Sequence, residues 1–173
     1  MSTPRLALRL MDCLRPFLDL RCLGGRLYLG SMFYLDFGEL FIATSSKGER
    51  IQIGEMTLSI RDTAWWLKNR AEIVASAEGV DSKTFEKIAN QLTGLRLVDV
   101  IEAASGEQIE IKLENEWLLI VDIGNQWESD SDIVQISLPD GRVVAVTEKG
   151  VLDQSAGFDA ERARNWATAP RHH

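Results

Sequence analysis

The most regular pattern in the chain is an alternation of apolar and polar residues between positions 106 and 123. Seven apolar residues occupy odd positions, namely Ile109, Ile111, Leu113, Trp117, Leu119, Val121 and Ile123. A period of two places successive side chains on opposite faces, which predicts strands with one buried face. The polar triplet Glu114-Asn115-Glu116 interrupts the run and predicts a hairpin turn, because asparagine readily adopts a left-handed backbone conformation.

Other segments predict further strands. Residues 27–37 carry apolar side chains in both phases, which is typical of a strand covered on two sides. The phase of alternation changes at Gly54-Glu55, and this change predicts a turn between paired strands. Gly24-Gly25 also predicts a turn. Residues 72–77, 95–101, 132–138 and 142–147 complete the predicted strands, with a hairpin turn at Pro139-Asp140-Gly141 between the last two.

Few segments have helical periodicity. Residues 81–93 place Phe85, Ile88, Ala89 and Leu92 on one side, with Asp81 or Ser82 able to cap the start and Gly94 the end. Residues 4–23 also have apolar side chains at helical spacing and predict an amphipathic helix that docks on the domain and breaks at Pro16. A short helix is predicted over residues 158–167.

Several of these signals occur twice in the same order, about sixty residues apart. Residues 48–53 resemble residues 106–111, and each segment is followed by a tryptophan and an acidic-Ile-Val strand. The order predicts two related β units, although short matches of this kind also arise by chance in β proteins. Each unit is too small to bury its own sheet well, so the two are expected to pack together.

The predicted fold is therefore mainly β, within the α+β class. Two pseudo-repeated antiparallel β units pack as a sandwich or a partly open barrel, with an N-terminal helix and one linking helix. The predicted segments are an N-terminal helical segment at 1–22, a first repeat at 23–80, a linking helix at 81–93, a second repeat at 92–150 and a C-terminal tail at 151–173. Together they form one compact domain.

Charge is distributed unevenly along the chain, which has a net charge of −7. Residues 102–141 contain ten acidic residues and one base, Lys112. Such a segment repels nucleic acid and favours a basic partner. The two cysteines, Cys13 and Cys22, form no CxxC motif, and no apolar run approaches the roughly 20 residues that span a bilayer. These features predict reduced thiols, no membrane insertion and a cytoplasmic location.

Catalytic and metal-binding motifs are not recognisable in the sequence. The two histidines are His172 and His173, at the very end of the chain, so no histidine is expected within the domain as a general base or ligand. The carboxylate pairs Glu114 with Glu116 and Asp130 with Asp132 are expected to be solvated rather than catalytic. Residues 128–132 lack the central glycine of a calcium loop. No cofactor, metal site or enzymatic activity is predicted, and the oligomeric state is left open.

The acidic segment instead supplies candidate partner-binding residues. These are Glu110, Glu114, Glu116, Trp127, Glu128, Asp130 and Asp132. The carboxylates would steer a basic protein to the surface, and a tryptophan within an acidic rim is a common type of binding anchor. Packing of Trp127 at the edge of the sandwich is the structural alternative.

In general character the chain resembles the small acidic immunity proteins of bacterial toxin–immunity systems. The resemblance rests on Gly48-Glu49-Arg50-Ile51, Trp66 with Ile73-Val74, Gly106-Glu107-Gln108-Ile109 and Trp127 with Ile133-Val134. It implies a non-catalytic inhibitor that masks a toxin. Two alternatives remain: a small-ligand carrier or sensor with a pocket between the halves lined by Phe33, Phe37 and Trp117, and a hydrolase that uses only carboxylates.

Overall fold

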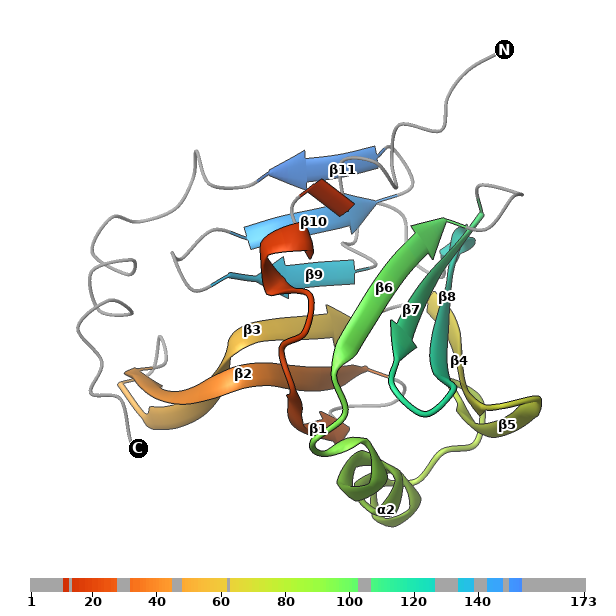
Figure 1. The fold of residues 1–173 in the computed structure, drawn as a ribbon, viewed down its shortest axis with the longest axis horizontal. Coiled ribbons are helices and arrows are strands. Elements are labelled where there is room, and N and C mark those ends of the chain that lie inside the picture. Colours follow the sequence, from red (N-terminus) through yellow and green to blue (C-terminus); the bar gives the residue numbers. More distant parts are fainter. Residues whose placement is uncertain are drawn as a thin grey trace.

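The computed structural model describes residues 11–12, 14–27, 32–44, 48–61, 63–102, 107–126, 134–138, 143–147 and 150–153. Within these residues the strands form two antiparallel sheets, which stay separate rather than closing into a barrel (Figure 1). The sheets pack against each other over a continuous hydrophobic core. The prediction of a mainly-β fold with one linking helix is confirmed, and of the two predicted arrangements, a sandwich or a partly open barrel, the structure has the sandwich.

The first sheet has the strand order β1-β2-β3-β9-β10-β11 and the second has the order β5-β4-β8-β7-β6. The first consists of β1 (Cys22–Leu27), β2 (Phe33–Thr44), β3 (Arg50–Ile60), β9 (Val134–Ser137), β10 (Val143–Thr147) and β11 (Gly150–Asp153). The second consists of β4 (Thr63–Asn69), β5 (Glu72–Ser76), β6 (Leu97–Glu102), β7 (Gln108–Leu113) and β8 (Trp117–Gln126). The strands β4 and β11 were not predicted.

The chain follows the same route twice. Strands β1, β2 and β3 form a meander in the first sheet, and the β4–β5 hairpin then crosses to the second sheet and pairs with β8. Strands β6, β7 and β8 form the equivalent meander in the second sheet, and the β9–β10 hairpin crosses back to pair with β3. Each half of the chain thus completes the sheet that the other half begins.

This strand order is the one expected of two related β units, but the residue matches are out of step with it. Residues 48–53 lead into β3, the third strand of its meander, whereas residues 106–111 lead into β7, the second strand of the other. By topology, β7 is the counterpart of β2. The short sequence matches between residues 48–53 and residues 106–111 therefore align β3 with β7, and these two strands are not equivalent in the topology.

The hairpin formed by β7 and β8 confirms the prediction for residues 106–123. All seven apolar residues at its odd positions are buried in the core. Asn115 and Glu116 adopt positive φ values of 57° and 61°, which allows the chain to reverse between the two strands. Trp117 packs in the core as its phase in the strand predicted.

Three other predictions about strands were wrong in detail. Residues 27–37 belong to two strands, since Leu27 pairs with Phe33 across the β1–β2 hairpin. Gly24 and Gly25 lie within β1 rather than in a turn. The chain runs straight through Gly54 within β3, and its change of phase is matched by an irregular register in β2 between Phe37 and Leu40. The predicted turn at Gly54-Glu55 is therefore wrong, and the irregularity beside it is a bulge in β2.

Helix α2 (Ser82–Leu92) links the two halves and packs against β1. Its buried residues are Phe85, Ile88, Ala89 and Leu92, as predicted. Phe85 contacts Phe33 and Trp65 with ring-centroid distances of 5.4 and 6.3 Å, and Phe33 and Trp65 meet edge-on at 4.6 Å. This aromatic cluster fixes the helix to both sheets, because Phe33 belongs to β2 and Trp65 to β4.

The N-terminal segment joins the two sheets at one corner. The backbone N–H of Asp19 donates to the carbonyl of Leu97 at 2.9 Å, and that of Cys22 donates to Leu95 at 2.7 Å. A short 3-10 helix, η1 (Arg15–Phe17), begins at the predicted break around Pro16, and Leu14 before it is buried. Residues 11, 12 and 14 are helical, but residues 18–23 of the predicted N-terminal helix are not, because the chain turns after η1 and enters β1 at Cys22. Residues 4–10 and 13, the 158–167 helix and the Pro139-Asp140-Gly141 turn lie outside the described residues.

Helix α2 begins at Asp81, whose carboxylate accepts hydrogen bonds from the Thr84 N–H at 2.7 Å and the Thr84 hydroxyl at 3.1 Å. These bonds lower the pKa of Asp81 from its ordinary value of 3.8. A lowered folded-state pKa means that the cap stabilises the fold above pH 3.8 and that this contribution is lost as the pH falls further. We expect Asp81→Ala to lower the Tm at pH 7.

The expected difference in Tm between Asp81→Ala and the parent chain shrinks once the pH drops below about 3.8, because the carboxylate of the unfolded chain is protonated there before that of the folded chain. Thermal melts followed by circular dichroism from pH 7 to pH 3 measure it. Ser82→Ala is the control, because the Ser82 side chain makes no capping hydrogen bond. A Tm difference that stays constant over this pH range contradicts the capping role.

Candidate functional site

The described carboxylates among the predicted partner-binding residues do not gather into one acidic patch. Glu110 lies in the middle of β7, whereas Glu114 and Glu116 lie in the β7–β8 turn. Glu114 forms an ion pair with Arg96 at 3.0 Å, and Glu116 forms one with Arg70 at 3.0 Å. The charges of Glu114 and Glu116 are thus each offset by an arginine from a distant part of the sequence. Trp127, Glu128, Asp130 and Asp132 lie outside the described residues.

The two turn carboxylates also reach to different neighbours. Glu114 accepts a hydrogen bond from the Arg96 backbone N–H at 3.1 Å beside β6, while Glu116 contacts Arg70 at the β4–β5 turn. The Glu116 side chain is 69% exposed and that of Glu114 is 33% exposed. Glu116 is thus largely solvated and Glu114 only partly so, and the two groups pair with different arginines rather than with each other.

The outward side of the second sheet carries two rows of side chains that cross its strands. The first row runs through Ser76, Trp66, Ile120, Glu110 and Ile101, and the second through Ile73, Lys68, Leu118, Lys112 and Asp99. Residues paired in this way lie close enough for their side chains to contact each other. We call these ten residues the outer sheet face.

The outer sheet face is rich in apolar side chains. Trp66, Leu118 and Ile120 are partly exposed, and Ile73 is 58% exposed. Within the described part of the chain, α2 packs against β1 and leaves this face uncovered (Figure 1). Trp65, the neighbour of Trp66, points the opposite way into the core, as a strand requires of adjacent residues.

Glu110 is the one carboxylate in the row of Trp66 and Ile120. It pairs across the strands with Ile120 on one side and Ile101 on the other. Among the described residues it has no hydrogen bond or ion pair through its side chain, in contrast to Glu114 and Glu116. A carboxylate between apolar neighbours favours a cationic contact from outside the chain.

The space between the sheets is filled by side chains. One gap there, beside Leu14, Phe37 and Met56, measures about 10 Å³. Such a volume holds no more than about one water molecule, and its lining is apolar. Phe33, Phe37 and Trp117, which were predicted to line a pocket between the halves, are buried and belong to the packed core.

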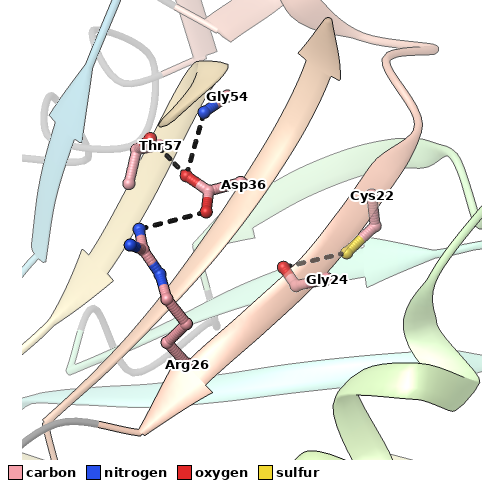
Figure 2. A network of polar contacts seen from close by, with 6 residues as sticks. All are labelled: Cys22, Gly24, Arg26, Asp36, Gly54 and Thr57. Atoms are coloured by element: carbon pink, nitrogen blue, oxygen red, sulfur yellow. Dashed lines mark hydrogen bonds and ion pairs between the residues drawn. The ribbon is translucent and has the colours of Figure 1, made fainter. Parts of the chain in front are cut away.

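Asp36 is a buried charged residue on β2, within an otherwise apolar run (Figure 2). One carboxylate oxygen accepts hydrogen bonds from the Thr57 hydroxyl at 2.6 Å and the Gly54 N–H at 3.2 Å, and the other pairs with Arg26 at 3.1 Å. Gly54 is needed here, because a Cβ would lie 2.7 Å from the Phe37 nitrogen. The network ties β1, β2 and β3 together.

An open groove of about 540 Å³ lies next to this network. One side is formed by residues 23–26 of β1 with Asp36, and the other by the Glu86, Ala89, Asn90 and Thr93 side of α2. Sequence reasoning missed both the network and the groove. The detectable signal was a lone aspartate among the apolar residues of β2, together with two consecutive glycines in β1.

Cys22 is buried near the groove, and its thiol donates to the Gly24 carbonyl at 3.7 Å (Figure 2). Burial raises the pKa of this thiol to about 11, so the reactive thiolate is scarce at neutral pH. No set of three His, Cys, Asp or Glu residues in the described ranges is arranged to hold a metal ion. In those ranges, no helix is long and apolar enough to cross a bilayer.

No protein-family model, curated protein or solved structure matches this chain. Its function must therefore be inferred from its own surface chemistry.

Proposed function

We propose that the chain is a binding protein that recognises a protein partner through the outer sheet face. The observation that carries the proposal is the partly exposed row of Trp66, Ile120 and Glu110 on an uncovered sheet. Tryptophan is enriched among residues that dominate binding energy, and a neighbouring carboxylate adds charge selectivity. Burial of Phe33, Phe37 and Trp117 in the core gives no support to the small-ligand alternative with a pocket between the halves.

The partner we propose is basic. The chain carries a net charge of −7, which steers cationic proteins toward it. Glu110 supplies a local carboxylate with no partner among the described residues, while Glu114 and Glu116 remain in their ion pairs. An immunity-type inhibitor that masks a basic toxin is the specific form of this proposal, and it rests on the general resemblance stated above.

The partner can be trapped by placing a photo-crosslinking amino acid at Leu118 in the source cells, with the same group at Glu39 on β2 as the control. Binding of the purified partner is then measured by calorimetry. We expect Trp66→Ala to weaken binding by about 30-fold, the effect of losing about 2 kcal/mol at a central contact. Equal affinity of Trp66→Ala and the parent chain would show that this face is not the site.

Two charge reversals on the same face test the sign of the partner. Glu110→Lys should slow association, whereas Lys112→Glu on the same strand should accelerate it, because both alter steering by a basic protein. Both effects should fade at high salt. Opposite responses would identify an acidic partner. If the captured protein arrests growth when expressed alone, rescue by the parent chain but not by Trp66→Ala supports the inhibitor form.

A further inference from the structure

The groove between α2 and β1 holds an arginine that is fixed in place but still half exposed. One guanidinium nitrogen of Arg26 bonds to Asp36 at 3.1 Å, and the guanidinium lies 5.6 Å from the centre of the Tyr34 ring. Asp36 is itself held by Gly54 and Thr57 (Figure 2). The Arg26 side chain is 52% exposed, so part of its donor set faces solvent.

An arginine held in this way is suited to bind a carboxylate. The guanidinium has five N–H donors in a planar fork, and among the described residues its side chain hydrogen-bonds only to Asp36. Ion pairing on one edge leaves another edge free for a second planar anion. Little ordering is needed on binding, because the side chain is already positioned, and such preorganisation increases affinity.

The rest of the groove adds an apolar and neutral surface. Its wall includes Leu40, which is 41% exposed, and Leu23. Gly25 also lines the groove, and no larger residue fits there, because a Cβ would lie 2.7 Å from the buried Leu35 side chain and 2.9 Å from the Tyr34 carbonyl. A volume of about 540 Å³ is in the range that accommodates a small molecule.

Glu86 narrows the choice of ligand. This residue lines the α2 side of the same groove, and its negative charge repels anions that carry several charges. Together with Asp36, which lines the groove and pairs with Arg26, it disfavours phosphate and nucleotides more strongly than a ligand with a single charge, which the free edge of the Arg26 guanidinium can bind. We propose that the groove binds a small molecule with one carboxylate and a short apolar chain, and that Arg26 binds the carboxylate. The site is separate from the outer sheet face, so the two proposals can fail independently.

The test is a titration of the isotope-labelled full chain, followed by amide and arginine side-chain NMR signals. The probe is N-acetyl-leucine, with its neutral amide and inorganic phosphate as comparisons. We expect saturable shifts at Gly24, Gly25 and Arg26 with N-acetyl-leucine alone. Arg26→Gln should weaken this binding at least 10-fold, the loss of a charge-assisted contact. Arg70→Gln, which removes an exposed arginine elsewhere, should leave it unchanged.

Asn90→Trp tests the same site without altering Arg26. It places a bulky ring on an exposed position of α2 that lines the groove, and it should abolish the shifts while the rest of the spectrum is preserved. Equal shifts with the neutral amide, binding retained in Asn90→Trp, or no saturable response to N-acetyl-leucine would each overturn the proposal. Equal binding of phosphate would overturn the assignment to carboxylates.

Discussion

Replacing Trp65 with alanine is expected to lower the free energy of unfolding by about 3–5 kcal/mol. The side chain is 1% exposed and packs edge-on against Phe33 at 4.6 Å and beside Phe85 at 6.3 Å. Truncation removes a large buried surface and leaves a cavity at the point where β2, β4 and α2 meet. Urea denaturation followed by circular dichroism measures the loss.

Trp66→Ala is the matched control, because it changes the same residue type one position along the same strand. Trp66 lies on the outer sheet face and loses mainly its cross-strand contact with Ile120, so the expected cost is about 1 kcal/mol. Equal losses for the two variants would contradict the assignment of opposite faces. A small loss for Trp66→Ala also ensures that its effect on partner binding reports contact rather than unfolding.

Replacing Asp36 with alanine is expected to cost about 2–4 kcal/mol. Thr57 and Gly54 lose their acceptor in a buried place, and Arg26 loses its counter-charge. The cost stays below that of a fully buried ion pair, because the Arg26 side chain is 52% exposed and remains hydrated. Urea denaturation of the full chain is again the measurement.

Two further variants separate the contribution of the Arg26 ion pair from that of the buried hydrogen bonds of Asp36. Glu39→Ala alters an exposed acid on the same strand and should change stability by less than about 0.5 kcal/mol. Arg26→Ala should cost less than Asp36→Ala, because the carboxylate keeps its bonds from Thr57 and Gly54. A loss for Asp36→Ala within 0.5 kcal/mol of the Glu39→Ala value would show that the buried network contributes little.

Elements defined by local spacing were the ones that the sequence predicted well. Four buried residues of α2 and the cap at Asp81 follow from a 3.6-residue period and its start signal. The β7–β8 hairpin follows from a period of two and a turn residue. Gly54 shows the limit of this reasoning, because the register of β3 depends on a bulge in β2, and the sequence of one strand does not reveal its neighbour's irregularity.

The candidate sites were predicted less well, because they depend on contacts between distant segments. The count of charges along residues 102–141 did not include Arg70 and Arg96, which lie outside this segment. In the folded chain these arginines form ion pairs with Glu116 and Glu114. Glu110 remains available because its neighbours across the sheet are isoleucines. The Arg26–Asp36 pair joins residues ten positions apart, and only the hairpin brings them together. Which charged side chains on this surface have partners therefore depends on how the strands are ordered in the sheets.

The reciprocal crossing of hairpins has a consequence for biosynthesis. A ribosome releases β4–β5 before β8 has been translated, and the edge of β3 stays open until β9 follows. The nascent polypeptide therefore carries two unsatisfied strand edges, which are prone to aggregate or to engage chaperones. Stable pairing of both sheets must then wait until β8 and β9 have been translated, and products terminated before β9 should be cleared rather than accumulate as soluble fragments.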